Sequence, residues 1–342
     1  MLIYLYIARM RKNAEIYNGC LVKKKYRMRL LIIIFKTYMK PNFLSKFKRK
    51  FLSKDSLAWL TYYCLVYCKL DKYVSDEFFL KLRYRCMLGK KLDLENPKSF
   101  TEKLQWLKLH DRKEIYSMMV DKVKVKEYIK SVLGEQYVIP LLHTWKNVDE
   151  INIDKLPNQF VLKWNHDSGS VVICKDKSSF DLQSAKEKLR RGQTENGYWH
   201  GREWPYKNVQ PLLFAETYMG GGNNECLTDY KFFCFHGEPK FMYISKDIAN
   251  EARTDFFDME FNRLAIRMKD PNSDILPDKP EKFEEMKKIA QLLSKDIPHV
   301  RIDFYIIDNK IYFGEFTFYH NSGFMNIQPA EWDNRIGNFI NI

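Results

Sequence analysis

The sequence lacks several patterns that would assign it at once to a class of protein. No cysteine pair has the CxxC spacing, and the seven cysteines are odd in number, so we expect packed thiols in a reducing compartment rather than disulfides or a zinc site. The longest purely apolar run, Leu30–Phe35, is far shorter than the roughly 20 residues that a membrane-spanning helix needs. The run is also too short for the hydrophobic region of a signal peptide. We therefore expect a cytoplasmic protein.

Familiar phosphate-binding and catalytic motifs are absent as well. Neither the Walker pattern GxxxxGK[ST] nor the dinucleotide pattern GxGxxG occurs, and there is no DxD motif. No Ser-His-Asp or Cys-His signature of a covalent nucleophile is present either. The sequence thus gives no sign of a P-loop, a dinucleotide-binding turn or an acyl-enzyme.

Acidic residues are nearly absent from one end of the chain. Residues 1–54 hold 15 Lys and Arg but only one acid, Glu15, whereas residues 55–342 hold 42 residues of each sign. The net charge of +14 therefore belongs to the N-terminal segment, and we do not expect the rest of the chain to bind nucleic acid. Basic clusters alternate with apolar stretches in this segment, which indicates either a helix lying on an anionic membrane surface or a solubilising tail. A third interpretation is that the segment precedes the true start, with Met28 as the initiator.

The remaining pattern predicts a mixed α+β chain without regular βαβ alternation. Residues 55–90 look helical, Ser99 and Glu102 form a capping box that opens a helix, and a second helix is expected from about Met118 to Leu133. Further on we expect helices near Ser184–Arg191 and over 280–295, and the strands Phe160–Trp164, Ser170–Cys174, Leu212–Tyr218, Tyr230–Phe235, Lys240–Ile244, Val300–Ile307 and Ile311–Phe318.

The aromatic stretch Gly192–Asn208 has no clear period, and we expect it to be a mobile loop. Its polar residues His200, Arg202 and Glu203 are candidates to face an acceptor substrate. The alternative is that they belong to an ordinary surface loop.

The last two predicted strands carry a pair of carboxylates at matching positions. If residues 308–310 form a three-residue loop, Asp303 on Val300–Ile307 lies directly opposite Glu315 on the returning strand. Cross-strand partners have Cβ atoms roughly 5 Å apart, and two carboxylates at that distance repel unless a cation lies between them. Mg²⁺ is one candidate because it prefers hard oxygen ligands, and neutralisation by Arg301 or a lysine is the alternative.

Two lysines stand where they can meet phosphate groups. Lys163 is expected to leave a strand next to the Gly-Ser turn 168–170, in which a glycine lets backbone N–H groups approach phosphate oxygens. Lys122 follows Asp121 at a predicted helix start. The alternative for this second pair is that Asp121 caps the helix and Lys122 is solvated.

Taken in order, these segments resemble the ATP-grasp superfamily, and within it the TupA-like branch associated with teichuronopeptide and other cell-surface polysaccharides. The resemblance covers roughly residues 91–335 and is carried by Asp121-Lys122, AETYM (215–219), NPKSFTEKLQW (96–106), KWNHDSGS (163–170), GREWPY (201–206), DYKFFCFHGEP (229–239), RIDFY (301–305) and GEFTFYHNSG (314–323). It implies an α+β ATP-grasp fold in which two α+β lobes clasp ATP. The first lobe would span about 91–212 and the second about 213–342, preceded by the helical lead-in 55–90 and the basic, mainly helical segment 1–54.

The resemblance also implies roles for individual residues. Mg²⁺ would be held by Asp303 and Glu315, and the catalytic residues would be Lys163 and Arg301, the latter stabilising an acyl phosphate or its transition state. The residues implied to contact ATP are Lys122 and Lys163 at the phosphates, Ser168, Gly169 and Ser170 in a phosphate lid, Glu216, Thr217, Tyr218 and Met219 in the inter-lobe linker that reads the adenine edge, and Asp229 and Lys231 near the ribose or phosphates.

One position departs from the family pattern. Many ATP-grasp enzymes have Glu-x-Asn as the metal motif, whereas this chain has Glu315-Phe316-Thr317. A threonine hydroxyl is a weaker ligand than an amide oxygen, so the resemblance supports one metal position and leaves a second open. Asn321 is the candidate to compensate.

The function implied by the resemblance is an ATP-dependent carboxylate–amine ligase that works through an acyl phosphate. Its expected substrates are a sugar uronate or an amino acid and an amine, on a cell-surface glycan, and residues 1–54 would hold the enzyme at the inner face of the membrane. Two alternatives remain: a glycosyltransferase-type or sugar-modifying enzyme, and a non-catalytic nucleotide-binding scaffold. Retention of Lys163, Asp303 and Glu315 argues against the scaffold.

Overall fold

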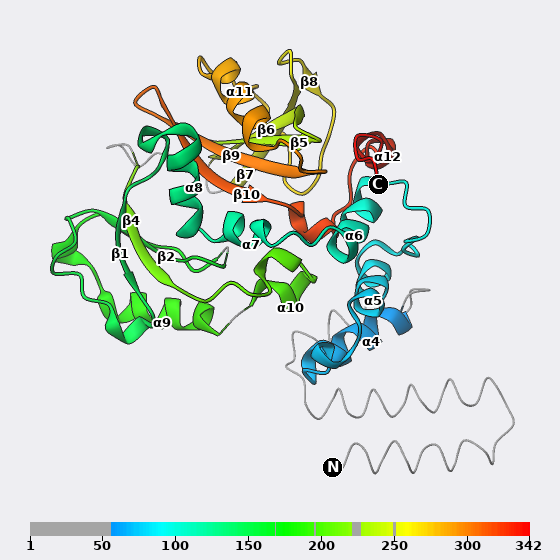
Figure 1. Cartoon of the computed structure of the whole chain (residues 1–342), viewed down its shortest axis with the longest axis horizontal. Coiled ribbons are helices and arrows are strands. Elements are labelled where there is room, and N and C mark those ends of the chain that lie inside the picture. Colours follow the sequence, from blue (N-terminus) through cyan, green and yellow to red (C-terminus); the bar gives the residue numbers. More distant parts are fainter. Residues whose placement is uncertain (1–55, 168, 195, 221–226, 249–250) are drawn as a thin grey trace, which may run out of the picture. The chain divides into compact units, whose positions relative to one another are not determined.

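The computed structural model describes residues 56–342 apart from 168, 195, 221–226 and 249–250 (Figure 1). The basic segment 1–54, and with it the membrane-surface, tail and alternative-start interpretations, lies outside the described residues, as does Ser168. The chain divides into two units, 1–60 and 61–342, and the sheets and the site described below belong to the second. In the described ranges, no helix has the length and apolar character needed to cross a bilayer.

Residues before the first strand form five α-helices within the described part of the chain. Their bounds are α4 (Ser56–Tyr67), α5 (Asp76–Leu88), α6 (Phe100–His110), α7 (Ile115–Val120) and α8 (Lys124–Leu133). The predicted capping box opens α6: the Ser99 hydroxyl accepts from the Glu102 N–H at 3.3 Å, and the Glu102 carboxylate accepts from the Ser99 N–H at 3.0 Å. Gly134 ends α8 at φ 107°, as the sequence indicates.

The helix predicted over Met118–Leu133 is wrong as a single element, because the chain leaves the helix at Asp121. This residue is extended, with φ −74° and ψ 105°, and its carboxylate accepts from the N–H groups of Val123 and Lys124 at 3.0 and 3.2 Å. Asp121 therefore caps α8, which satisfies the helix donors and sets Lys122 at the entrance of the helix.

The first of the two described sheets is small and has four strands. Its strands β1 (Leu141–Trp145), β2 (Phe160–Trp164), β3 (Val172–Cys174) and β4 (Leu213–Thr217) are ordered β1-β4-β2-β3, with all neighbours antiparallel. Helix α9 (Leu182–Gln193) packs beside β2 and β3, and the side chains between them form a separate small core (Figure 1). Sequence reasoning missed β1, whose five residues include only one that is buried.

A six-stranded antiparallel sheet forms the second layer of structure. Its strands are ordered β10-β9-β5-β6-β7-β8, with bounds β5 (Asp229–Phe235), β6 (Glu238–Ile248), β7 (Glu251–Asp258), β8 (Arg263–Leu264), β9 (Val300–Ile307) and β10 (Lys310–Thr317). Helix α11 (Phe283–Leu293) covers one face through the apolar side that its sequence predicts (Figure 1). The helix α12 (Glu331–Gly337) follows near the C-terminus.

The two cores divide the chain differently from the lobes implied by the sequence. Apolar residues of α6, α7 and α8 belong to the large core of the six-stranded sheet, although they precede the four-stranded sheet in the chain. Strand β4 pairs with β1 and β2, so the change of sheet comes after Thr217 rather than near residue 212.

The stretch Gly192–Asn208, expected to be a mobile loop, contains two helical turns, α10 (Gly197–Gly201) and η5 (Trp204–Tyr206). Arg202 is fully buried against the rings of Phe79 and Trp199, and its guanidinium lies 3.1 Å from the Asp76 carboxylate. Both interpretations of Arg202, as an acceptor contact and as a surface residue, are therefore wrong. It anchors the stretch to α5.

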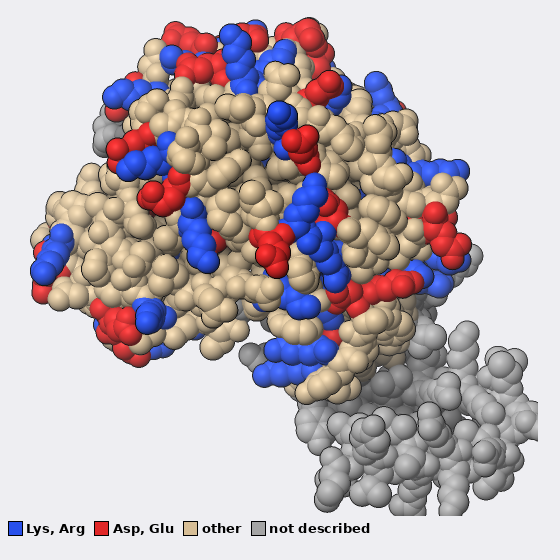
Figure 2. Space-filling view, in the orientation of Figure 1, with Lys and Arg blue, Asp and Glu red and all other residues tan. Residues whose placement is uncertain are grey.

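Charged side chains of both signs are interspersed over the face of the molecule shown in Figure 2. This distribution agrees with the equal numbers of basic and acidic residues in 55–342.

Candidate active site

The hairpin of β9 and β10 pairs Asp303 directly with Glu315, as expected, although by a different route. The loop is two residues long: Asp308 and Asn309 have φ 49° and 56°, and Ile307 pairs with Lys310. The resulting one-residue offset is removed by a β-bulge at Gly314. The three-residue loop predicted from the sequence is therefore wrong, while the facing pair of carboxylates is confirmed.

Arg301 lies between these two carboxylates in the described structure. Its Nε and Nη2 donate to the two oxygens of Asp303, each at 2.7 Å, and Nη2 also donates to Glu315 Oε1 at 3.2 Å. Asp303 is 1% exposed, and burial alone would raise its pKa, but the charges of Arg301 and Lys231 outweigh burial and hold the pKa below its ordinary value. The carboxylate is therefore ionised at neutral pH.

Strand β5 adds a second cation and a third carboxylate to this face of the sheet. Lys231 pairs with Asp303 across the strands, and its Nζ donates to Asp303 Oδ2 at 2.7 Å and to Asp229 Oδ1 at 2.9 Å. Burial raises the pKa of Asp229, an effect that Lys231 opposes. We call Asp229, Lys231, Arg301, Asp303 and Glu315 the carboxylate cluster.

The residues that follow β10 complete the surroundings of the cluster. Thr317 donates to Glu315 Oε1 at 3.2 Å, so its hydroxyl lies at the metal motif. His320 is buried and lies 2.6 Å from Arg301 Nη1 through Nδ1, and Asn321 lies beside the other ring nitrogen, Nε2. Burial, then the Arg301 charge, hold the pKa of His320 well below its ordinary value, so the imidazole is neutral.

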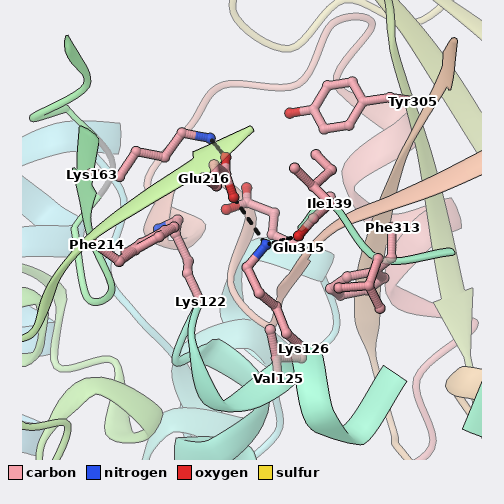
Figure 3. Close-up of a pocket in the computed structure, with 12 residues that line it drawn as sticks. Lys122, Val125, Lys126, Ile139, Lys163, Phe214, Glu216, Tyr305, Phe313 and Glu315 are labelled. Carbon is pink, nitrogen blue, oxygen red and sulfur yellow. Dashed lines mark hydrogen bonds and ion pairs between the residues drawn. The ribbon is translucent and has the colours of Figure 1, made fainter. Parts of the chain in front are cut away.

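A pocket opens between the two sheets beside the carboxylate cluster (Figure 3). One wall comes from α8 and the four-stranded sheet, and the opposite wall comes from the β9–β10 hairpin. Its lining residues are Lys122, Val125, Lys126, Val138, Ile139, Lys163, Phe214, Glu216, Tyr305, Phe313, Gly314 and Glu315. The pocket thus brings together four of the predicted site residues, namely Lys122, Lys163, Glu216 and Glu315.

Glu216 lies on the wall of this pocket and is paired with two lysines (Figure 3). Its Oε1 lies 2.5 Å from Lys163 Nζ, and its Oε2 lies 2.9 Å from Lys126 Nζ. Burial would raise the pKa of Glu216, but the two ammonium groups outweigh it and lower the pKa. Lys126 also donates to the Ile139 carbonyl at 2.7 Å, and burial lowers the pKa of its ammonium group.

Lys122 lies at the base of the predicted phosphate lid. Its Nζ donates to the Asp167 carbonyl at 2.5 Å, and its backbone N–H donates to the Asn165 carbonyl at 3.1 Å. Beyond this base, Gly169 is exposed and Ser170 is half-buried, so both are accessible to a ligand. His166 is buried, and its ring nitrogens lie 3.2 Å from the Asn165 side chain and from the Gly192 carbonyl, so it is a structural residue of the loop.

The other implied linker residues lie where the chain passes from one sheet to the other. Thr217 ends β4 and donates its N–H to the Pro140 carbonyl at 3.0 Å. Tyr218 and Met219 follow the strand and are half-buried. The backbone N–H and C=O groups of Tyr218 and Met219 therefore take no part in the pairing of β4 with β1 and β2.

Sequence reasoning missed one charged residue that lines the pocket, Lys126. In the helix predicted over Met118–Leu133, Lys126 stands four residues after Lys122 and would share its face, a spacing that indicates a second lysine beside Lys122.

The donor set fits a hard divalent cation. Asp303 and Glu315 are opposed carboxylates with the Thr317 hydroxyl beside them, which matches the preference of Mg²⁺ for one or two carboxylates completed by phosphate and water oxygens. Within the described residues no group of three or more His, Cys, Asp or Glu side chains is arranged to hold a metal by itself. A metal here would therefore depend on oxygens that a bound nucleotide supplies.

Comparison with protein families gives a match over most of the chain. The family described as TupA-like ATP-grasp matches residues 102–341. A comparison with curated proteins gave no match.

Several solved structures are similar to the chain. D-alanine–D-alanine ligase from Bacillus anthracis, complexed with ATP, is 16% identical over 59% of this chain and 55% of its own, with a TM-score of 0.36. The Helicobacter pylori D-alanine–D-alanine ligase is 16% identical over 66% of this chain and 64% of its own, with a TM-score of 0.35. N5-carboxyaminoimidazole synthase from Aspergillus clavatus, in complex with ADP and an aminoimidazole ribonucleotide, is 12% identical over 60% of this chain and 46% of its own, with a TM-score of 0.35. The chain thus spans less than two thirds of the length of each of these proteins.

Proposed function

Because the chain belongs to the TupA-like ATP-grasp family, we propose that it is an ATP-dependent ligase that joins a carboxylate to an amine. One observation carries the proposal. The pocket between the sheets has two lysines, Lys122 and Lys163, on one wall, where they could bind phosphate groups. Glu315 of the facing carboxylate pair lies on the other wall. ATP in this pocket would meet cations at its phosphates and carboxylates at the position of its metal ion.

The proposed reaction has two steps. A carboxylate oxygen of the first substrate attacks the γ-phosphorus of ATP, and the bond from that phosphorus to the bridging oxygen breaks with its electron pair leaving on ADP. The amine nitrogen then attacks the acyl carbon, the bond from carbon to the phosphate oxygen breaks, phosphate leaves, and the amine proton passes to solvent. No enzyme nucleophile takes part, so positioning and neutralisation of charge carry the catalysis.

Five charged residues have a part in this scheme. Lys122 and Lys163 would bind phosphate oxygens, and Arg301 would stabilise the charge on the acyl phosphate. When bound, Mg²⁺ held by Asp303 and Glu315 would neutralise charge on the phosphates. The backbone of Thr217 to Met219 would bind the adenine edge.

The substrate class is proposed from the branch of the family. The TupA-like branch is associated with cell-surface polysaccharides, which makes a sugar uronate or an amino acid the candidate carboxylate and an amine on a glycan precursor the candidate acceptor. We propose that the enzyme acts in the cytoplasm at the inner face of the membrane. The charge of +14 carried by residues 1–54 supports contact with anionic lipid.

Trapping with hydroxylamine tests the reaction class. An acyl phosphate reacts with hydroxylamine to give a hydroxamate, so the protein with Mg-ATP, hydroxylamine and a panel of uronates and amino acids should release ADP and form a hydroxamate with one of them. Asp303→Asn should abolish both products. Asp308→Asn, an exposed change in the turn of the same hairpin, should leave both unchanged. The ligase proposal fails if no carboxylate supports ADP release, and UDP release from a nucleotide sugar would favour the glycosyltransferase alternative.

Sedimentation with liposomes tests the proposed location. The full chain should sediment with vesicles that contain anionic lipid and stay in solution with neutral vesicles. Replacing the cluster Lys23, Lys24 and Lys25 by glutamine should weaken sedimentation by roughly the 1 kcal/mol per basic residue expected near an anionic surface. Unchanged sedimentation of this variant would contradict the assignment of the contact to the N-terminal segment.

A further inference from the structure

The turn that follows β10 has an unusual backbone. Asn321, Ser322 and Gly323 have φ angles of 46°, 56° and 65°, so three consecutive residues are in the left-handed region. Non-glycine residues adopt this conformation only at a cost, and a run of them persists only where the surroundings fix it. The left-handed turn, residues 320–323, must therefore be held from outside.

Helix α6 holds this turn through two buried side chains, Gln105 and Lys108, both 0% exposed. Gln105 Nε2 donates to the carbonyls of Gly323 at 2.9 Å and Ser322 at 3.2 Å, and Lys108 Nζ donates to the Ser322 carbonyl at 2.7 Å. The turn packs closely against Gln105, since a Cβ at Gly323 would lie 2.3 Å from Gln105 Nε2.

Lys108 is an expensive residue to bury. Its ammonium group also donates to Gln105 Oε1 at 2.9 Å and lies 4.6 Å from the centre of the Phe324 ring. An apolar residue would fill the same space without the cost of removing a charge from water. The Glu203 carboxylate opposes part of this cost, and the position of Lys108 Nζ at the carbonyl of a left-handed residue lets it hold the turn.

His320, the first residue of the turn, connects the turn to the carboxylate cluster through Arg301. His320 Nδ1 lies 2.6 Å from Arg301 Nη1, and because a guanidinium group can only donate, Nδ1 must be the acceptor. Together with the bonds to Asp303 and Glu315, this bond engages four of the five N–H groups of Arg301, and the fifth, on Nη1, has no acceptor among the residues that the structure describes.

We propose that His320 is a positioning residue for Arg301, and that Lys108 acts one step further back by holding the turn that presents His320. The inference rests on the proposed function, in which Arg301 stabilises an acyl phosphate. Asp303 and Glu315 hold one edge of the planar guanidinium group, and His320 holds the edge that carries Nη1. With the plane held on both edges, the remaining N–H of Nη1 keeps one direction, in which it can donate to an oxygen of the substrate.

Two substitutions of similar size separate the hydrogen bond from the packing of the ring. His320→Asn retains an acceptor at the place of Nδ1, whereas His320→Leu removes it. In the hydroxamate assay, the leucine variant should lower kcat by about tenfold, the loss typical of one hydrogen bond to a charged group, with the KM for ATP unchanged. The asparagine variant should recover most of the activity, and equal losses in both variants would overturn the proposal.

A measurement that does not need turnover separates this inference from the proposed function. In protein labelled with ¹⁵N-arginine, the Arg301 Nε–H resonance is assigned by its loss in Arg301→Lys. His320→Leu should shift this resonance and speed its exchange with water, while His320→Asn should keep it near the wild-type position. If His320→Leu leaves the resonance unchanged, the positioning role is wrong. If the resonance responds but no carboxylate supports ADP release, the contact stands and the ligase proposal fails.

The part assigned to Lys108 has its own control on the same helix. Lys108→Met should reproduce the shift of the Arg301 resonance, and adding it to His320→Leu should change little more, because both act on one contact. Lys103→Met removes an ammonium group from α6 that donates to the Ile340 carbonyl at 2.8 Å, and it should leave the Arg301 resonance in place. A Lys108→Met protein that is folded and has the wild-type resonance would contradict the role of Lys108.

Discussion

Replacing Glu216 by glutamine directly tests the arrangement of charges in the pocket between the two sheets. The Glu216 carboxylate is 7% exposed and faces Lys126 and Lys163, which are 12% and 26% exposed. Glutamine has almost the same shape but no charge, so Glu216→Gln leaves two ammonium groups close together without their counter-ion. The variant should therefore be less stable than the wild type, although the glutamine side chain fills the same volume.

The magnitude follows from the burial of the three side chains. Removing one partner of a fully buried ion pair costs about 3–5 kcal/mol, and the partial exposure of Lys163 reduces this to about 2–3 kcal/mol. For a chain of this length that loss lowers the Tm by roughly 3–5 °C. The Glu216 pKa is lowered in the folded protein, so its stabilising contribution is complete above its unfolded pKa and is lost as the pH falls through the folded value. The difference in stability should thus be constant at neutral pH and shrink below about pH 4.5.

Thermal unfolding monitored by circular dichroism measures this difference. Glu135→Gln is the matched control, because Glu135 pairs with Lys130 at 3.0 Å on an exposed surface and should give no measurable change. Saturating ATP should narrow the gap between Glu216→Gln and the wild type, since phosphate groups would replace the missing counter-ion of Lys163. An unchanged Tm for Glu216→Gln without ATP would refute the reasoning about this pocket.

Three further substitutions test other parts of the site. A Cβ at Gly314 would lie 3.0 Å from the Asp303 carbonyl oxygen and 3.1 Å from the Tyr305 ring. Gly314→Ala should therefore lower the free energy of unfolding by about 1–3 kcal/mol in a urea titration. A neutral effect would mean that the bulge does not set the pairing of β9 with β10. Lys163→Met should weaken ATP binding about tenfold by isothermal titration, the loss expected for one charge-assisted contact, and unchanged affinity would remove Lys163 from the phosphate site. Thr317→Asn should tighten binding of Mn²⁺ in the presence of ADP, measured by electron paramagnetic resonance, because an amide oxygen is a better ligand than a hydroxyl; equal affinity would place the metal away from Thr317.

Features set by neighbouring residues were predicted well from the sequence. The capping box of Ser99 and Glu102, the helix stop at Gly134 and the strands Phe160–Trp164 and Val300–Ile307 all depend on local hydrogen bonds or on alternation over a few residues. The α+β architecture and the family were recognised in the same way, from segments that each lie within one element or turn.

The facing carboxylates show how a correct pairing can be reached through a wrong loop. Parity along two strands decides which residues share a face, but it does not distinguish a three-residue loop from a two-residue loop followed by a bulge. The signals for the true arrangement were present, because Asp308-Asn309 suits a turn with two left-handed residues and Gly314 interrupts a strand. They are recognised only when considered together.

Contacts between distant segments account for most of what was missed. Lys126 meets Glu216 90 residues later in the chain, and Arg202 reaches back to Asp76, so neither pair has a periodic signature. The sequence of the stretch Gly192–Asn208 predicts a mobile loop because its helical turns α10 and η5 depend on such contacts rather than on a periodic pattern of its own.

The charges of the site explain why binding of a nucleotide here would be an exchange rather than an addition. In the described structure the carboxylate cluster sets two cations against three carboxylates, and Glu216 is shared by two lysines. A phosphate that binds Lys163 must therefore compete with Glu216, and a metal ion that binds Glu315 must compete with Arg301. The competing protein groups are already in place and partly buried, so a ligand that enters would not have to remove a full shell of water from each charge. Under the proposed function, affinity would depend on the difference between two sets of ion pairs. ATP and its metal ion would then promote each other's binding, because each would release a protein charge that the other can use.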